Sequence, residues 1–121
     1  MRLDPATGFI VVDANETISI TVTASNTAYM AAFPPAPSCT GWSAIQGPTN
    51  GKESRAFVAP ATSGTQCFVV ITFDFQPDVT GAFPPGAKYD IHVAGSNGGT
   101  FDDFPVTPPP VQNRQYKFRV A

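Results

Sequence analysis

Few residues in this chain are of a type that performs acid–base or metal chemistry. His92 is the only histidine, and in the alternating sequence YDIHV it faces outward with Asp90. Hydrolytic triads and imidazole metal sites need a further base or ligand close by, so we interpret His92 as a surface residue. The chain contains no Gly-x-Ser-x-Gly, no phosphate-binding loop and no Cys-x-x-Cys. These observations predict a protein that is not an enzyme.

Two neighbouring carboxylates, Asp102 and Asp103, follow the glycine-rich stretch GSNGGT. Oxygen-rich loops can hold calcium, but the alternating ligand spacing of an EF-type loop is absent, and adjacent side chains of a strand point in different directions. A hairpin turn with solvated carboxylates is therefore the favoured interpretation, and a calcium site at Asp102 and Asp103 is the alternative. No other cofactor is expected.

Aromatic residues outside the clearest strands are the most suggestive candidates for binding. They are Tyr29, Phe33, Trp42, Phe83, Phe101 and Phe104. Exposed rings stack on the faces of sugars or bury against another subunit, whereas buried rings would close the ends of a core. We name Trp42, Tyr29 and Phe101 as the candidate ligand-binding residues and keep the second interpretation open.

The two cysteines, Cys39 and Cys67, are spaced so that a disulfide would close a long loop. Such a bond stabilises a small domain by about 3 to 4 kcal/mol and is typical of oxidising compartments. We predict a Cys39–Cys67 disulfide, and two separate thiols are the alternative.

Charge and hydropathy exclude two classes of partner. The formal net charge is −2, only 7 residues are Lys or Arg, and they form no basic run. Nucleic acid is therefore not an expected partner. No apolar run approaches the roughly 20 residues that cross a bilayer, so membrane insertion is not expected either. The amino-terminal sequence MRLDPATG lacks the apolar centre of a signal peptide.

Period-two alternation predicts the elements that position these residues. It is clearest at 17–24, where isoleucine and valine alternate with threonine and serine. The run 67–75 is apolar on both faces, as in a strand that is covered on both sides or that lies at a subunit interface. Other strands are predicted at 9–12, 89–93 and 114–120, with weaker signals at 28–32, 55–59 and 101–106.

These short strands and their turn signals predict an all-β fold with almost no helix. We expect one domain over residues 1–121, an antiparallel β-sandwich of jelly-roll or immunoglobulin-like type. A long irregular loop rich in proline and glycine is predicted at about 34–53. The charged outer face of 114–120 suits an edge strand or a solvent-facing strand.

Two stretches, VVDANETISITVTAS and APATSGTQCFVVITF, resemble the bacterial pre-peptidase C-terminal domains. These are small β-sandwiches attached to secreted proteases and other exported enzymes. Asn15 stands where that family usually has glycine, and the chain lacks an Asp-rich D-x-D-L segment. The resemblance implies a β-sandwich of an exported protein and assigns no site residue here.

Two functions are consistent with these observations. The first is an accessory recognition module of a secreted bacterial protein, located outside the cell or at its surface and binding a glycan or cell-surface polymer. The alternative is a structural subunit of a virion decoration, coat or pilus-like assembly, whose partners are copies of itself or other structural subunits.

Overall fold

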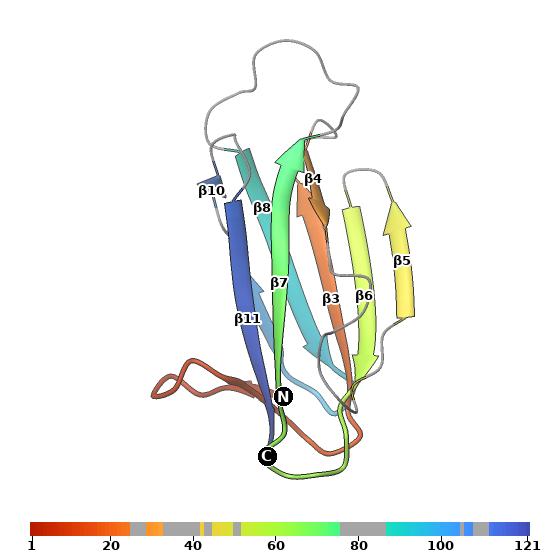
Figure 1. Cartoon of the computed structure of the whole chain (residues 1–121), viewed down its shortest axis with the longest axis vertical. Coiled ribbons are helices and arrows are strands. Elements are labelled where there is room, and N and C mark those ends of the chain that lie inside the picture. Colours follow the sequence, from red (N-terminus) through yellow and green to blue (C-terminus); the bar gives the residue numbers. More distant parts are fainter. Residues whose placement is uncertain are drawn as a thin grey trace.

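The protein is a two-layer β-sandwich. The computed structural model describes residues 1–24, 29–32, 42, 45–49, 52–75, 87–104, 106–107 and 112–121. Two sheets face each other across one core, and none of the described residues lies in a helix. The predicted all-β sandwich is therefore confirmed. Figure 1 shows both layers, with β7 and β11 in front of β3 and β8.

The first layer, which we call the β7 sheet, has five strands. Their order is β1 (Arg2–Leu3), β2 (Ile10–Val12), β11 (Gln112–Val120), β7 (Gln66–Phe75) and β4 (Tyr29–Ala32). β11 runs antiparallel to β7 and parallel to β2. The sequence predicted an edge or solvent-facing strand at 114–120; β11 lies between β2 and β7, so the edge alternative is wrong.

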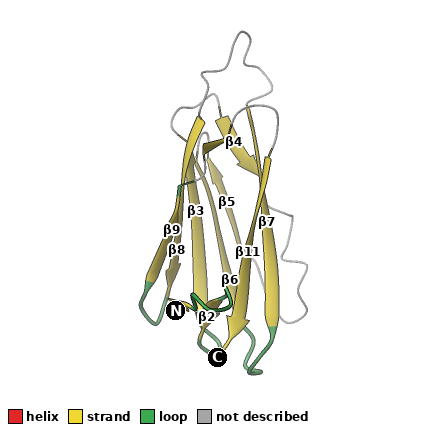
Figure 2. Cartoon of the chain, turned by 90° about the vertical axis from the view of Figure 1, so that its left-hand side faces the viewer, coloured by secondary structure: helices red, strands yellow, loops and turns green. Residues whose placement is uncertain are grey.

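The second layer, which we call the β3 sheet, carries six strands. Their order is β10 (Val106–Thr107), β8 (Ala87–Gly95), β3 (Thr17–Ala24), β6 (Lys52–Val58) and β5 (Ile45–Thr49), and β9 (Thr100–Asp103) also pairs with β8. All pairings of this sheet are antiparallel. Figure 2 views the two layers edge on.

The core is built by the inward positions of the alternating strands. Its buried side chains include Ile18, Ile20 and Val22 of β3, Cys67, Val69 and Ile71 of β7, Tyr89, Ile91 and Val93 of β8, and Tyr116, Phe118 and Val120 of β11. Each set recurs at every second residue, because successive side chains of a strand point to opposite faces. The inward residues predicted for these four strands are confirmed where side chains are described.

The segment predicted to be an irregular loop contains a strand. β5 occupies Ile45–Thr49, and β6 begins at Lys52, both inside 34–53. The sequence did not predict this strand, because it contains Gly47 and Pro48, and both residue types normally interrupt strands. Among the described elements β5 pairs only with β6, and proline is tolerated at such an edge. The remaining positions of the predicted loop, apart from Trp42, lie outside the described residues.

Two outward positions of β7 are exposed. Phe68 and Val70 were expected to be covered within the chain or to lie at a subunit interface; their exposed fractions of 39% and 40% exclude the first alternative and leave the second open. Arg114 was predicted on the outer face of β11, but it lies opposite Ile71, on the inward side of the register. The outer face of β11 is therefore charged through Lys117 and Arg119.

The start of the chain closes one side of the sandwich. Met1 packs against the core, and its amino group donates to the carbonyl oxygen of Gly98 at 3.0 Å. Gly99 has φ = +87°, and a Cβ there would collide with the backbone carbonyl of Met1. Glycine is therefore required at this close approach. Within the described part of the chain, no helix is long and apolar enough to span a membrane.

Candidate functional site on the outer face of the β3 sheet

The chemically active side chains of the chain gather where β8 and β9 pair. Asp90 and His92 point outward from β8, because Tyr89, Ile91 and Val93 fill the core between and beside them. Asp102 lies opposite His92 on β9. One short hairpin therefore brings an imidazole and two carboxylates to the same solvent-facing surface.

His92 and Asp102 make a direct contact. The Nδ1 atom of His92 lies 2.9 Å from Oδ1 of Asp102, and the exposed fractions of the two side chains are 45% and 36%. The carboxylate orients the ring and leaves Nε2 directed away from it. This pair can both donate and accept hydrogen bonds at the surface.

Asp90 completes the polar part of the site. Its pKa is raised above the usual aspartate value, first by partial burial and then by the hydrogen bond and charge of Asp102. The charge of His92 acts in the opposite direction. Asp102 is therefore close enough to Asp90 to raise the pKa of Asp90.

Phe104 lies beside this pair of carboxylates. The ladder of β9 ends with Asp103 opposite Ile91, and the ladder of β10 begins with Val106 opposite Lys88. Both ladders share one register. Neither ladder pairs Phe104, but the same register continued between them makes its position the one opposite Asp90. The Phe104 side chain is 64% exposed, more than any other large apolar side chain among the described residues. We call Asp90, His92, Asp102 and Phe104 the β8–β9 cluster.

A row of hydroxyl groups extends from this cluster across the sheet. Thr21 of β3 lies opposite His92, and Ser54 of β6 lies opposite Thr21. The Thr21 and Ser54 hydroxyl oxygens are 3.5 Å apart. The surface therefore presents one exposed ring next to carboxylate, imidazole and hydroxyl groups, a combination that can stack on a ligand and hydrogen bond to its hydroxyls.

The two carboxylates predicted as a calcium alternative point apart. Asp102 faces outward to His92, whereas Asp103 accepts a hydrogen bond of 2.7 Å from the hydroxyl of Tyr116. Arg114 also approaches Asp103, with Nε at 3.4 Å from Oδ2. Among the residues that the structure describes, no group of three or more His, Cys, Asp or Glu side chains could hold a metal ion. Asp102 and Asp103 therefore do not converge on one ion.

Two of the three candidate aromatic residues, Trp42 and Phe101, pack against the core. Trp42 is 7% exposed and packs between Phe57 and Phe118, with ring centroids 6.4 Å from each. Phe101 is half-buried and packs edge to face against Tyr116, with ring centroids 6.4 Å apart. Both residues follow the second interpretation, in which rings complete the core. Tyr29 lies on β4, and its side chain is outside the described residues.

Only one of the two cysteines of the predicted disulfide is among the described residues. Cys67 is fully buried on β7 and is not a free thiol. Cys39 lies outside the described residues, so the Cys39–Cys67 pairing stays a prediction.

Some important residues gave little signal in the sequence. Glu16 and Arg55 are 1% and 8% exposed, although charged residues are rarely buried. Phe104 was one of six candidate rings, and its position two residues after Asp102 was the available clue, since such residues share a face of a strand. Its neighbour Asp90 is distant in sequence, and that pairing is set by the fold.

Comparison of the chain with protein-family models, curated proteins and solved structures found no match in any of the three. The resemblance to pre-peptidase C-terminal domains therefore stays a prediction.

Proposed function

We propose that this protein is a non-enzymatic recognition module that binds a saccharide or a cell-surface polymer through the β8–β9 cluster. The observation that carries the proposal is the exposed ring of Phe104 at the register position opposite Asp90, on the hairpin that pairs His92 with Asp102. Sugar rings present an apolar face and a rim of hydroxyls, which match an aromatic ring flanked by charged acceptors.

Binding is favoured over catalysis because of where the cluster lies. The Asp102–His92 contact is like the carboxylate–imidazole part of a hydrolytic triad. Both side chains are substantially exposed, however, and water weakens the electrostatic effects on which transition-state stabilisation depends. An open sheet face with outward polar groups suits a long polymer that lies along it.

The test is a titration with a defined panel, namely the hexaoses of cellulose, chitin, xylan and mannan, followed by calorimetry. We expect one member to bind, and Phe104→Ala to weaken that binding by about tenfold, the equivalent of one lost stacking contact. Asp102→Asn is expected to weaken it as well, because a charged acceptor is lost.

Phe68→Ala is the matched control, since Phe68 is an exposed phenylalanine on the other sheet. If no member of the panel binds, or if Phe104→Ala and Phe68→Ala bind alike, the proposal fails. Trp42→Ala is not a suitable variant, because it would open the core instead of removing a surface contact.

A second candidate function is that of a structural subunit. The exposed Phe68 and Val70 on the outer face of β7 favour it, because neighbouring apolar side chains on a sheet face are often covered by another chain. The localisation follows the function in either case: we propose the cell exterior for the recognition module and a virion or similar assembly for the subunit.

A further inference from the structure

Three of the four large apolar side chains that are exposed in the described structure form two groups. Phe68 and Val70 lie on the outer face of the β7 sheet, and Phe104 lies on the β3 sheet. The remaining one is Leu3 on the short β1. Each group has charged neighbours, and the charges differ in sign.

Two cations lie beside the ring of Phe9, which packs on the group on β7. Phe9 packs edge to face against Phe68, with ring centroids 6.0 Å apart. The Nζ atom of Lys117 is 4.9 Å from the centroid of the Phe9 ring, and Cζ of Arg119 is 5.6 Å from it. Lys117 also lies directly opposite Phe68 in the β11–β7 ladder. We call Phe9, Phe68, Val70, Lys117 and Arg119 the cationic strip.

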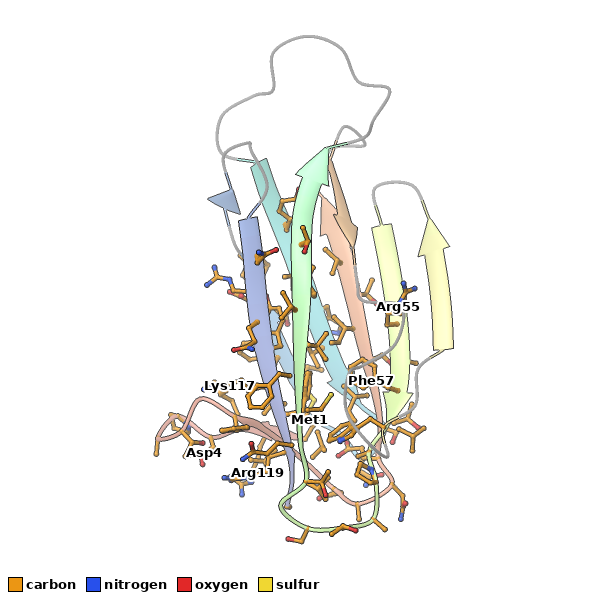
Figure 3. The ribbon with its side chains drawn as sticks, viewed as in Figure 1. Met1, Asp4, Arg55, Phe57, Lys117 and Arg119 are labelled. Carbon is orange, nitrogen blue, oxygen red and sulfur yellow. The ribbon has the colours of Figure 1, made fainter. Side chains whose placement is uncertain are left out.

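The cations of the strip are held in place by contacts within the chain. Arg119 is 3.6 Å from the carboxylate of Asp4, and the ammonium of Lys117 donates to the carbonyl oxygen of Thr7 at 3.3 Å. Figure 3 shows Asp4, Lys117 and Arg119 together beside the hairpin formed by β1 and β2. Such fixed side chains lose little conformational freedom when a partner binds.

The β8–β9 cluster has the complementary chemistry. Its exposed ring, that of Phe104, lies near the carboxylates of Asp90 and Asp102. In the strip, the exposed ring of Phe68 packs on the half-buried ring of Phe9, which an ammonium and a guanidinium flank. Carboxylates attract these cations, and a phenylalanine ring attracts them through its face. Both are carried on sheet faces, and two such faces can stack.

We propose that the cationic strip of one copy docks on the β8–β9 cluster of a second copy. The contact joins two different surfaces, so a pair of copies keeps one free strip and one free cluster, and repetition gives a ring or a filament. This inference rests on the second candidate function and names its interface. It also makes saccharide binding and self-association competitors for the same cluster.

The experiment measures solution mass by light scattering over a range of protein concentrations, at low and at high salt. The average molar mass of the wild-type protein should rise above the 12.8 kDa of the monomer as the protein concentration increases. High salt should return this mass to that of the monomer. Lys117→Glu and Asp102→Lys should each remain monomeric. Lys117→Arg keeps the charge and should assemble like the wild type.

Mixing the two charge-reversed variants is the decisive step. Lys117→Glu puts an acidic side chain opposite Phe68 in the strip, which can pair with the lysine of Asp102→Lys in the cluster, and the unchanged surfaces of the two variants still fit each other. An equal mixture should therefore assemble although neither variant does alone. If Lys117→Glu does not fold, as judged by circular dichroism, Val70→Asp takes its place, since Val70 is exposed.

The outcomes separate the proposals. A wild-type protein that stays monomeric at every concentration overturns both this contact and the structural-subunit function. Assembly that persists in Lys117→Glu, or a mixture that does not assemble, overturns this contact alone. Saccharide binding is tested independently on Lys117→Glu, whose β8–β9 cluster is unchanged.

Discussion

Glu16 is a buried carboxylate that holds three parts of the chain together. Its oxygens accept hydrogen bonds from the backbone nitrogens of Asp13 at 2.8 Å and Asn97 at 3.0 Å. The amino group of Met1 lies 3.5 Å away. A charged acceptor with several donors is among the stronger polar interactions in a protein.

We therefore predict that Glu16→Gln destabilises the fold by about 1.5 to 3 kcal/mol, because the amide nitrogen of glutamine would face a donor and leave it unsatisfied. Urea unfolding measures this free energy. Asp90→Asn is the control, since Asp90 is exposed, and it should change the free energy of unfolding by less than about 0.5 kcal/mol. Equal effects of the two variants would show that Glu16 has no special role.

The raised pKa of Tyr116 predicts that the stability of the fold depends on pH. Burial raises its pKa above the usual tyrosine range, and the hydrogen bond and charge of Asp103 raise it further. In the unfolded chain the hydroxyl titrates near pH 10, as an ordinary tyrosine does. As the pH rises, the unfolded state loses this proton first, so the stabilising contribution is complete below about pH 10 and declines above it.

Tyr116→Phe should lower stability at neutral pH and make the alkaline decline shallower than in the wild type. Urea unfolding at a series of pH values from neutral to strongly alkaline tests this expectation. The other tyrosines are present in both proteins, so the difference between the two curves isolates Tyr116. Parallel curves would contradict the assignment.

At the scale of elements, β7 offers a direct test of the two layers. Val69 is 1% exposed and Val70 is 40% exposed, although they are adjacent and identical in type. Threonine has nearly the shape of valine but adds a hydroxyl, which costs about 1 to 3 kcal/mol where it is buried without a partner.

Val69→Thr should therefore lose about 1 to 3 kcal/mol of unfolding free energy, and Val70→Thr less than about 0.5 kcal/mol. Chemical denaturation of the two variants under identical conditions gives the comparison. Similar losses would mean that the outer face of β7 is covered in solution, which is the result expected only of an assembled protein.

The sequence predicted elements well where one face is buried and the alternation is strict, as in 17–24 and 89–93. It could not predict β5, because Gly47 and Pro48 suit a loop equally well and only pairing with β6 makes this segment a strand. The site was harder still. That Phe104 lies opposite Asp90 depends on strand register, which is a property of the folded sheet and has no local signal.

At the scale of the whole molecule, the state of the two cysteines tests the predicted disulfide. Cys67 is fully buried and is not a free thiol. We predict that the unfolded, unreduced chain resists alkylation at both cysteines, whereas the reduced chain takes up two adducts in its mass spectrum. Reduction should lower the free energy of unfolding by about 2 to 5 kcal/mol. If the unreduced chain takes up adducts, the two cysteines are free thiols. The inference of an oxidising compartment then fails.

We propose that the outer face of the β3 sheet recognises a saccharide, and nuclear magnetic resonance gives the most direct test. Backbone amide shifts of the labelled protein would be followed during titration with the four hexaoses. We predict saturable changes in amide chemical shift that are concentrated at Asp90, His92, Asp102 and Phe104. The amide shifts of Trp42 and of the cationic strip should not change. Shifts confined to the β7 sheet, or no shifts with any of the four sugars, would contradict it.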